Sequence, residues 1–209
     1  MSAPRTPWDQ RMARVLVRPL VRARVHPNLV TALTALLALA GAALLASTQP
    51  QAVNWGAGLF VLSRFLDHFD GELARQSGRS SPLGYLLDYL AGGVSYAALF
   101  IGIAIGLYHG SLGAWVIALG ALGSASAVLA VWLNMAIDRL HDTGAAVGYP
   151  ALAGFELEDG IYLLAPVAWL GWLAPFFVAA CVGAGVYLLY TAGVLLRTRS
   201  AHRLVRESE

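Results

Sequence analysis

The sequence predicts an all-helical membrane protein in which six transmembrane helices follow an amphipathic helix at the membrane surface. Of the 209 residues, 58% are hydrophobic and 12% are charged, and the mean hydropathy is +0.64. Soluble domains carry charge on about a quarter of their residues, so this chain has too few charged side chains to cover a water-facing surface. Apolar stretches of about 20 residues, the length that crosses a bilayer, recur along the chain.

The apolar stretches place the six spans in order, and the fifth is the shortest. They cover Leu29–Ser47, Val53–Ser77, Leu83–Tyr108, Leu112–Ala136, Ile161–Leu173 and Pro175–Leu196. Arginine gathers before the first span and after the second, fourth and sixth, whereas the other three connections carry no charge. Because cytoplasmic segments collect Lys and Arg, we expect both termini and the connections that hold Arg79 and Arg139 to be cytoplasmic.

These features divide the chain into a cytoplasmic or interfacial arm over residues 1–28, a six-helix domain over 29–197 and a cytoplasmic tail over 198–209. The arm is too long and too rich in arginine to be a cleavable signal peptide. The net charge of +2 does not indicate a nucleic-acid partner, and anionic membrane lipids already explain the basic residues. The single cysteine, Cys181, excludes an internal disulfide.

The arm has the pattern of an amphipathic helix. Its basic stripe, spaced by three and four residues, consists of Arg11, Arg14, Arg18 and Arg22. Its aliphatic side consists of Ala13, Leu16, Val17 and Leu20. This pattern predicts a helix in the headgroup layer with aliphatic side chains toward the acyl chains, and Pro19 should bend or split it. A basic arm that only sets the topology explains the arginines equally well. Asn28 is expected to cap the first span, with Thr31 at its third helical position.

Carboxylates converge at the cytoplasmic ends of the second and third spans. On a helix Asp67 and Asp70 share one face with Gly71 and Ala74, where the small residues leave room for a ligand. Asp88 lies about 10 Å beyond the connection between the two spans, at a depth similar to that of Asp70. Three uncompensated charges in a bilayer would be very costly, so we expect a divalent cation. Oxygen ligands favour Mg²⁺, Mn²⁺ or Ca²⁺.

Two alternatives to a metal site follow from the same residues. The aspartates could form structural ion pairs with Arg64 and Arg75, or they could line the path of a cation or solute in a transporter. The transporter reading is disfavoured because the acids cluster near one membrane face, with no partner acids in the outer half.

The spacing of these residues resembles the signature of the CDP-alcohol phosphatidyltransferase family. That signature reads Asp-x2-Asp-Gly-x2-Ala-Arg, then about eight residues, then Gly-x3-Asp-x3-Asp. The chain supplies these positions as Asp67, Asp70, Gly71, Ala74, Arg75, Gly84 and Asp88. The six spans, the amphipathic arm and the Pro27-Asn28-x2-Thr31 entry are also similar to the family.

The resemblance implies a transferase of phospholipid biosynthesis that uses Mg²⁺ or Mn²⁺. Asp67, Asp70 and Asp88 would be metal ligands. The nucleotide and pyrophosphate would be bound by Asn28, Thr31, Asp67, Gly71, Ala74, Arg75, Arg79 and Gly84. An alcohol would displace CMP at the β-phosphorus of a CDP-linked lipid while the metals neutralise the pyrophosphate oxygens.

The chain departs from the family at one position of the motif. Gly92 stands where the family has its fourth aspartate, which completes a two-metal centre and is the proposed general base. The catalytic proton acceptor could instead be Asp88 alone, or one of the acids in the polar stretch Ile137–Gly160, namely Glu156, Glu158 or Asp159. Ser95 lies on the same face as Asp88 but is a poor base. Losing a general base lowers a rate by roughly 10²–10⁴-fold, so an enzyme without one would be slow.

We therefore carry two principal hypotheses. In the first, the protein moves a phosphatidyl or substituted phosphoryl group from a CDP-linked donor to a small alcohol or alcohol phosphate. In the second, it is a catalytically impaired relative that binds CDP-lipid or divalent metal without transfer. Membrane lipids are partners in both, a homodimer is compatible with both, and the expected location is a bacterial cytoplasmic membrane.

Overall fold

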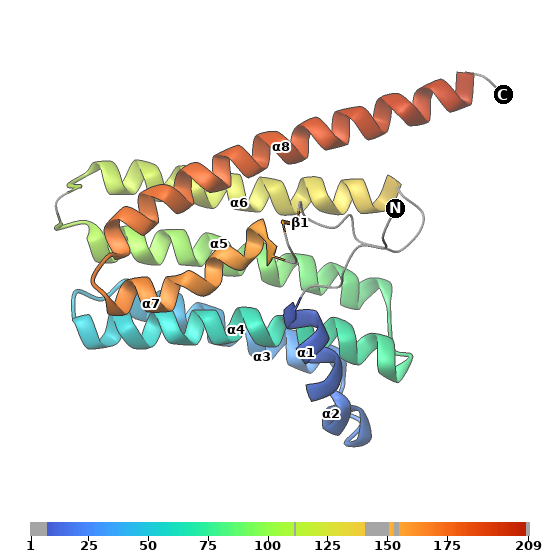
Figure 1. The fold of residues 1–209 in the computed structure, drawn as a ribbon, viewed down its shortest axis with the longest axis horizontal. Helices are drawn as coiled ribbons and strands as arrows, with labels where there is room; N and C mark the ends of the chain where they lie inside the picture. Colours follow the sequence, from blue (N-terminus) through green and yellow to red (C-terminus); the bar gives the residue numbers. More distant parts are fainter. Residues whose placement is uncertain (1–7, 111, 141–150, 153–154, 208–209) are drawn as a thin grey trace.

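The computed structural model describes residues 8–110, 112–140, 151–152 and 155–207, with side chains omitted at 151–159 and 201–207. Its body is a bundle of long helices that run roughly parallel or antiparallel to one another, and two short helices lie across one end (Figure 1). A ladder of two-residue strands, β1 (Ala151–Leu152) and β2 (Phe155–Glu156), pairs antiparallel beside it. The predicted all-helical class therefore holds apart from this ladder.

Five long helices form the bundle. They are α3 (Pro27–Leu45), α4 (Pro50–Ser77), α5 (Pro82–Leu107), α6 (Trp115–Leu140) and α8 (Leu173–Glu207). Proline occupies the first turn of α3, α4 and α5, where its missing N–H loses no helical hydrogen bond. Helix α3 packs against both α4 and α5, and α6 packs between α5 and α8.

Glycine lets α3 approach its neighbours closely. A Cβ at Gly102 of α5 would lie 2.2 Å from the Ala42 carbonyl oxygen, and one at Gly106 would lie 2.3 Å from that of Leu45. Any larger residue would push α5 away from α3, because real Cβ atoms do not approach backbone oxygens so closely. The Gly102-x3-Gly106 pair is thus a packing motif, which brings the C-terminal end of α5 against the C-terminal end of α3.

The fifth predicted span differs from the structure. The segment expected at Ile161–Leu173 consists of a 3₁₀ helix, η1 (Leu157–Leu163), and a short helix, α7 (Leu164–Trp169). A six-residue α-helix is about 9 Å long, which is too short to cross a bilayer. Gly171, with φ 76°, turns the chain directly from α7 into α8, which runs 11 residues beyond the predicted end at Leu196.

Four helices of the described chain are long and apolar enough to cross a membrane: α3, α5, α6 and α8 over Leu173–Ser200. Six transmembrane helices are therefore not confirmed. Helix α4 has the required length, with 28 residues, but its second half carries Arg64, Asp67, Asp70, Glu72 and Arg75. These charged residues, which include two of the clustered aspartates, lower the mean hydropathy of α4.

The arm forms two short helices, α1 (Trp8–Leu16) and α2 (Arg18–Arg22), and the break before Pro19 confirms the predicted split. The arginines of the predicted basic stripe, Arg11, Arg14, Arg18 and Arg22, are exposed as expected. Ala13 and Val17, however, are fully buried against Phe69 and Leu73 of α4, where acyl-chain contacts were expected. Part of the arm's apolar face is therefore a docking surface for the bundle.

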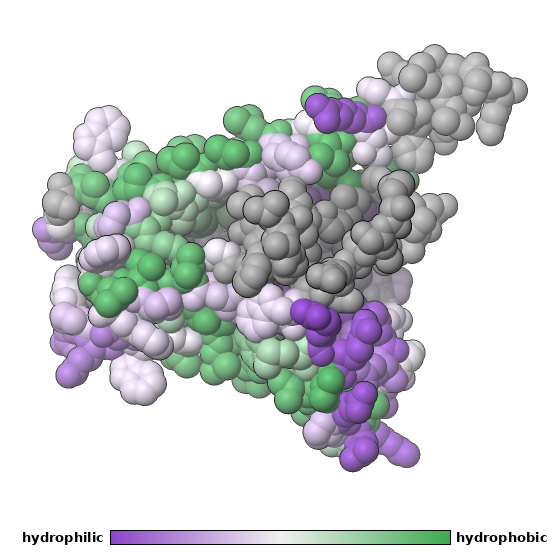
Figure 2. All heavy atoms as spheres, viewed as in Figure 1, coloured by the Kyte–Doolittle hydropathy of each residue, from purple (hydrophilic) through white to green (hydrophobic). Residues whose placement is uncertain are grey.

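Hydrophilic side chains gather at the two ends of the bundle, most densely around α1 and α2, and apolar side chains cover the flank between them (Figure 2). The arm, the α4–α5 turn and the C-terminal end of α8 all lie at one end, opposite the α3–α4 and α5–α6 connections (Figure 1). The three Arg-rich segments thus share one end of the molecule.

Candidate metal centre

A tight turn brings α4 and α5 together above the acidic residues. Gly78 ends α4 in the left-handed conformation, with φ 67°, and the Arg79 N–H donates to the Ala74 carbonyl oxygen at 3.0 Å. Ser81 then caps α5 by accepting a hydrogen bond from the Gly84 N–H at 3.0 Å. This glycine end and serine cap satisfy backbone groups on both sides of the turn. They fix the antiparallel register that sets Asp70 opposite Asp88.

The three predicted aspartates converge. Each of Asp67, Asp70 and Asp88 offers a carboxylate oxygen, and these oxygens all lie within 4.8 Å of one another. Asp70 is the most deeply placed, with only 4% of its surface exposed, while the other two are partly buried. Helix α3 contributes through Thr31, whose hydroxyl donates to Asp70 Oδ2. Three helices therefore build one anionic centre.

This donor set fits a hard divalent cation. The cluster offers only carboxylate oxygens, the ligands of Mg²⁺, Mn²⁺ and Ca²⁺, and contains no Cys or His that would favour zinc. Partial burial also leaves the negative charges poorly solvated, so a bound cation would relieve their mutual repulsion. The arrangement is compatible with a site for Mg²⁺ or Mn²⁺.

Arg64 pairs with the cluster and Arg75 pairs elsewhere. Arg64 Nη1 lies 3.0 Å from Asp67 Oδ2, so the alternative of a structural ion pair is correct for this one contact. Arg75 instead binds Glu72, with Nη2 2.9 Å from Oε2, and Arg14 of the arm approaches the same carboxylate at 3.3 Å. Glu72, which the sequence analysis did not single out, thus links the arm to α4.

The glycines of the motif differ in how much free space surrounds them. A Cβ at Gly71 would meet only the guanidinium of Arg75, at 3.4 Å, so this side of α4 is closed by a flexible side chain alone. A Cβ at Gly84 would lie 3.2 Å from Asn28 Oδ1, so the amide of Asn28 lies against α5. At Gly92 a Cβ would have nothing within 4 Å. Position 92 therefore has room for a side chain.

Two predicted residues have other local roles. Asn28 does not cap α3; His26 does, because its extended backbone precedes Pro27 and its Nδ1 accepts from the Asn28 N–H at 3.2 Å. Arg79, expected near the pyrophosphate, donates from Nη1 to the Arg24 carbonyl oxygen at 3.1 Å. Arg24 itself has a φ of 56°, so Arg79 ties the α4–α5 turn to the bend that ends the arm.

The predicted loop acids cannot be placed in the site. The side chains of Glu156, Glu158 and Asp159 lie outside the described residues, although the backbone of this segment forms β2 and η1. The end of η1 is anchored to the arm, because the Tyr162 hydroxyl donates to Asp9 Oδ2 at 3.1 Å. Ser95, the weak alternative, is buried in α5 at 3% exposure.

Asp9 and His68 form a second polar contact that sequence reasoning missed. His68 Nε2 lies 2.8 Å from Asp9 Oδ2, which joins α1 to α4 one residue after Asp67. Burial alone would raise the pKa of Asp9, but His68, the Gln10 amide and Tyr162 together hold this pKa below its usual range. His68 therefore has the structural role of docking the arm.

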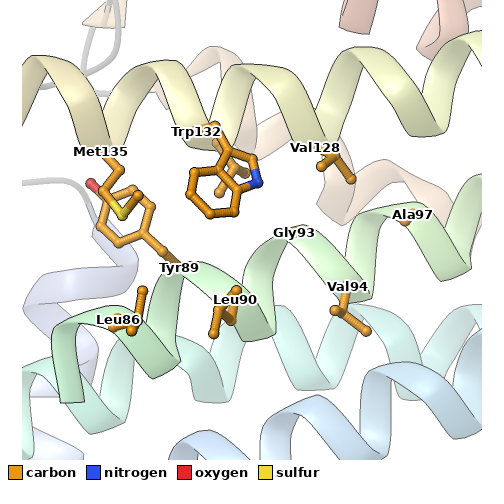
Figure 3. Close-up of a pocket in the computed structure, with 10 residues that line it drawn as sticks. Leu86, Tyr89, Leu90, Gly93, Val94, Ala97, Val128, Trp132 and Met135 are labelled. Carbon is orange, nitrogen blue, oxygen red and sulfur yellow. The ribbon is translucent and has the colours of Figure 1, made fainter. Parts of the chain in front are cut away.

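A further set of polar contacts joins α5 to α6. The Tyr89 hydroxyl donates to Asp138 Oδ2, and that of Tyr85 lies 3.4 Å from the same oxygen. Asp138 was expected in a polar loop beginning at Ile137, but α6 continues to Leu140. Next to Tyr89, which lines it, an apolar pocket opens between α5 and α6, with Leu90 and Val94 on the α5 side and Trp132 on the α6 side (Figure 3). None of the three clustered aspartates lines this pocket.

The fold of the described chain is that of a helical bundle with four helices apolar enough to cross a membrane, and its three clustered aspartates are compatible with a metal site. The chain belongs to the CDP-alcohol phosphatidyltransferase family, whose sequence profile matches residues 24–187. A sequence comparison with curated proteins gave no significant match.

Solved structures of the Mycobacterium tuberculosis phosphatidylinositol phosphate synthase have the same fold. The form with CDP-DAG bound superposes with a TM-score of 0.66 at 18% identity, over 88% of this chain and 94% of that one. The form in complex with manganese and citrate gives 0.66 at 19% identity, over 88% of each chain. The apo form gives 0.62 at 18% identity, over 88% and 93%.

Proposed function

We propose that the protein transfers a phosphatidyl or related phosphoryl group from a CDP-linked lipid to a small alcohol or alcohol phosphate, with release of CMP. The observation that carries this proposal is the convergence of Asp67, Asp70 and Asp88 within 4.8 Å. Family membership and the CDP-DAG bound to a relative of the same fold support the choice of donor.

In this proposal the three aspartates hold a divalent cation, and Thr31 fixes the orientation of Asp70 through its hydrogen bond. The cation, Mg²⁺ or Mn²⁺, would neutralise charge on the pyrophosphate oxygens when bound. At Gly71 only the flexible side chain of Arg75 covers the backbone of α4, and Asn28 reaches α5 at Gly84 from α3, so both would be available to the nucleotide. Arg75 can leave Glu72 for a phosphate oxygen, because 61% of its side chain is exposed.

The reaction forms a bond between the alcohol oxygen and the β-phosphorus and breaks the bond from that phosphorus to the oxygen of CMP. The alcohol proton needs an acceptor. One candidate acceptor is Asp88, the carboxylate that α5 contributes to the cluster. The alternative is a carboxylate from Glu156, Glu158 or Asp159. Tyr162 supports the alternative because it anchors the chain three residues after Asp159 to Asp9, which pairs with His68 next to Asp67.

The test is CMP release from CDP-diacylglycerol by the purified protein with Mn²⁺ or Mg²⁺. The acceptors to screen are glycerol phosphate, inositol phosphate, inositol and serine. We expect CMP release with one acceptor, and its loss in Asp70→Asn. The matched control is Asp138→Asn, which removes a carboxylate bound to tyrosines outside the cluster. Release that continues undiminished in Asp70→Asn would contradict the assignment.

The second candidate is a relative that binds CDP-lipid without transferring it, and Gly92 favours it because the position offers no carboxylate. This candidate predicts that CDP-diacylglycerol protects the protein against thermal unfolding while no acceptor releases CMP. Loss of that protection in Asp70→Asn would locate the bound nucleotide at the cluster.

A further inference from the structure

Arg64 is a buried cation built into the acidic centre. It precedes Asp67 by one turn of α4, and only 9% of its side chain is exposed. One face of its guanidinium lies over the ring of Tyr96 in α5, with Cζ 4.9 Å from the ring centroid. Its Nη1 lies 3.0 Å from Asp67 Oδ2. The guanidinium is thus held between the two helices that supply the metal ligands.

The aromatic residue that holds the guanidinium, Tyr96, lies on the same face of α5 as Gly92, the position at which the motif lacks its aspartate. Asp88, Gly92 and Tyr96 follow one another at intervals of four residues, so they form a stripe along one face of α5. Tyr96 fixes Arg64 at the far end of this stripe, and Asp88 marks its near end. Position 92, between them, has open space around it. A carboxylate there would lie one turn from Asp88 and one turn from Tyr96 on the same face of α5.

Charge balance indicates what Arg64 does. Asp67, Asp70 and Asp88 carry three negative charges, of which one divalent cation neutralises two. Arg64 supplies the remaining positive charge. The nearby charges of Asp9 and Glu72 are already engaged, by His68 and by Arg75 with Arg14. A second divalent cation would leave the centre with an excess of positive charge in a poorly solvated site, which is unfavourable.

We propose that Arg64 is a permanent second cation of this centre, so that the protein binds a single divalent metal ion. The proposal rests on the metal site of the proposed function and adds its stoichiometry. Arg64 acts through Asp67 and through its charge, and it is therefore a positioning residue. Its effect on a metal is opposite to that of a ligand, because a fixed positive charge next to Asp67 repels a bound cation.

The experiment counts Mn²⁺ bound to the purified protein by electron paramagnetic resonance, with CMP release measured alongside. The parent should bind one Mn²⁺ per chain. Arg64→Gln should bind Mn²⁺ roughly tenfold more tightly, because it removes one unit of charge repulsion, while CMP release falls. Arg64→Lys, which keeps the charge, should bind Mn²⁺ as the parent does. The double variant Arg64→Gln with Gly92→Asp should bind two Mn²⁺. The control is Arg139→Gln, an exposed arginine at the end of α6, which should leave Mn²⁺ affinity unchanged.

The outcomes separate this inference from the proposed function. Two Mn²⁺ ions on the parent would overturn it, as would lower Mn²⁺ affinity in both Arg64 variants, which a merely structural arginine would produce. No Mn²⁺ binding by the parent would overturn it together with the metal site. One Mn²⁺ per parent chain with the predicted variant affinities, but without CMP release, would support the role of Arg64 and contradict only the transfer reaction.

Discussion

The orientation of the Asp70 carboxylate depends on a hydroxyl group from another helix. It is almost fully buried and accepts hydrogen bonds from the Thr31 hydroxyl and, at 2.6 Å, from the Gly71 N–H. Both donors favour the ionised carboxylate that a metal ligand must be. Thr31, 39 residues away in the sequence, therefore determines the orientation of a ligand supplied by α4.

Replacing Thr31 with Val tests this dependence. The change keeps the shape of the side chain and removes the donor, so Mn²⁺ affinity should fall by about 10–100-fold, the usual effect of losing a hydrogen bond to a metal ligand. Mn²⁺ titration followed by paramagnetic resonance measures it. The control is Thr34→Val, which removes a buried hydroxyl that donates to the Thr31 carbonyl oxygen. Equal affinities in the two variants would show that Thr31 does not position Asp70.

Gly92→Asp tests the missing carboxylate. A side chain at position 92 meets nothing within 4 Å, so the substitution should be tolerated, and the added charge should raise Mn²⁺ affinity. If the absence of a base limits the reaction, CMP release should rise by up to ~10²–10⁴-fold. Gly92→Asn, which adds nearly the same volume without charge, should change neither quantity.

A different result would identify another proton acceptor. If a loop carboxylate has taken over, Gly92→Asp should gain little, and one of Glu156→Gln, Glu158→Gln or Asp159→Asn should abolish CMP release. A parent that releases CMP and is indifferent to all four substitutions would show that none of these positions accepts the proton.

At the scale of elements, the arm is fixed to the bundle by both apolar and polar contacts. Ala13 and Val17 pack on α4, and Asp9 binds His68 and Tyr162. Glu72 adds a contact to Arg14, whose side chain is 58% exposed and contributes little for that reason. The buried contacts of Asp9 should therefore dominate the polar part of the docking.

Asp9→Asn should loosen the arm by about 1–3 kcal/mol, since it weakens charge-assisted hydrogen bonds in a buried place. Hydrogen exchange of residues 8–22 should become faster, whereas Arg11→Gln, an exposed change in the same helix, should leave it unaltered.

The folded-state pKa of Asp9 is below its ordinary value of 3.8. The contribution of the carboxylate is therefore complete above pH 3.8 and is lost only as the pH falls through the lower pKa. Loss of protection already well above pH 4 would contradict this assignment.

At the scale of the whole molecule, the basic segments lie at one end of the bundle, together with the acidic centre (Figure 1). We predict that this end faces the cytoplasm. Cysteines introduced at Gln51 and at Ser200, both exposed and located at opposite ends, should react with membrane-impermeant reagent from opposite sides. The buried Cys181 must first be replaced with alanine. Labelling of both positions from the same side would refute the topology.

The sequence by itself determined the helical class, the limits of most long helices to within a few residues and the set of aspartates that meet. These features follow from local rules, because apolar length defines a span and a period of 3.6 residues defines a face. The placement of Gly92 on the same face of α5 as Asp88 was also predictable, since one turn separates the two residues.

Only the tertiary structure decided the rest. It showed that α7 is too short to span, that Ala13 and Val17 are buried against α4, and that Asp9 pairs with His68, 59 positions later in the sequence. It also placed Arg64 between Asp67 and Tyr96, where spacing along one helix revealed only the first partner. Such contacts join segments that are distant in the sequence, and they depend on how closely glycines let the helices approach. Periodicity within a single helix carries no information about that approach.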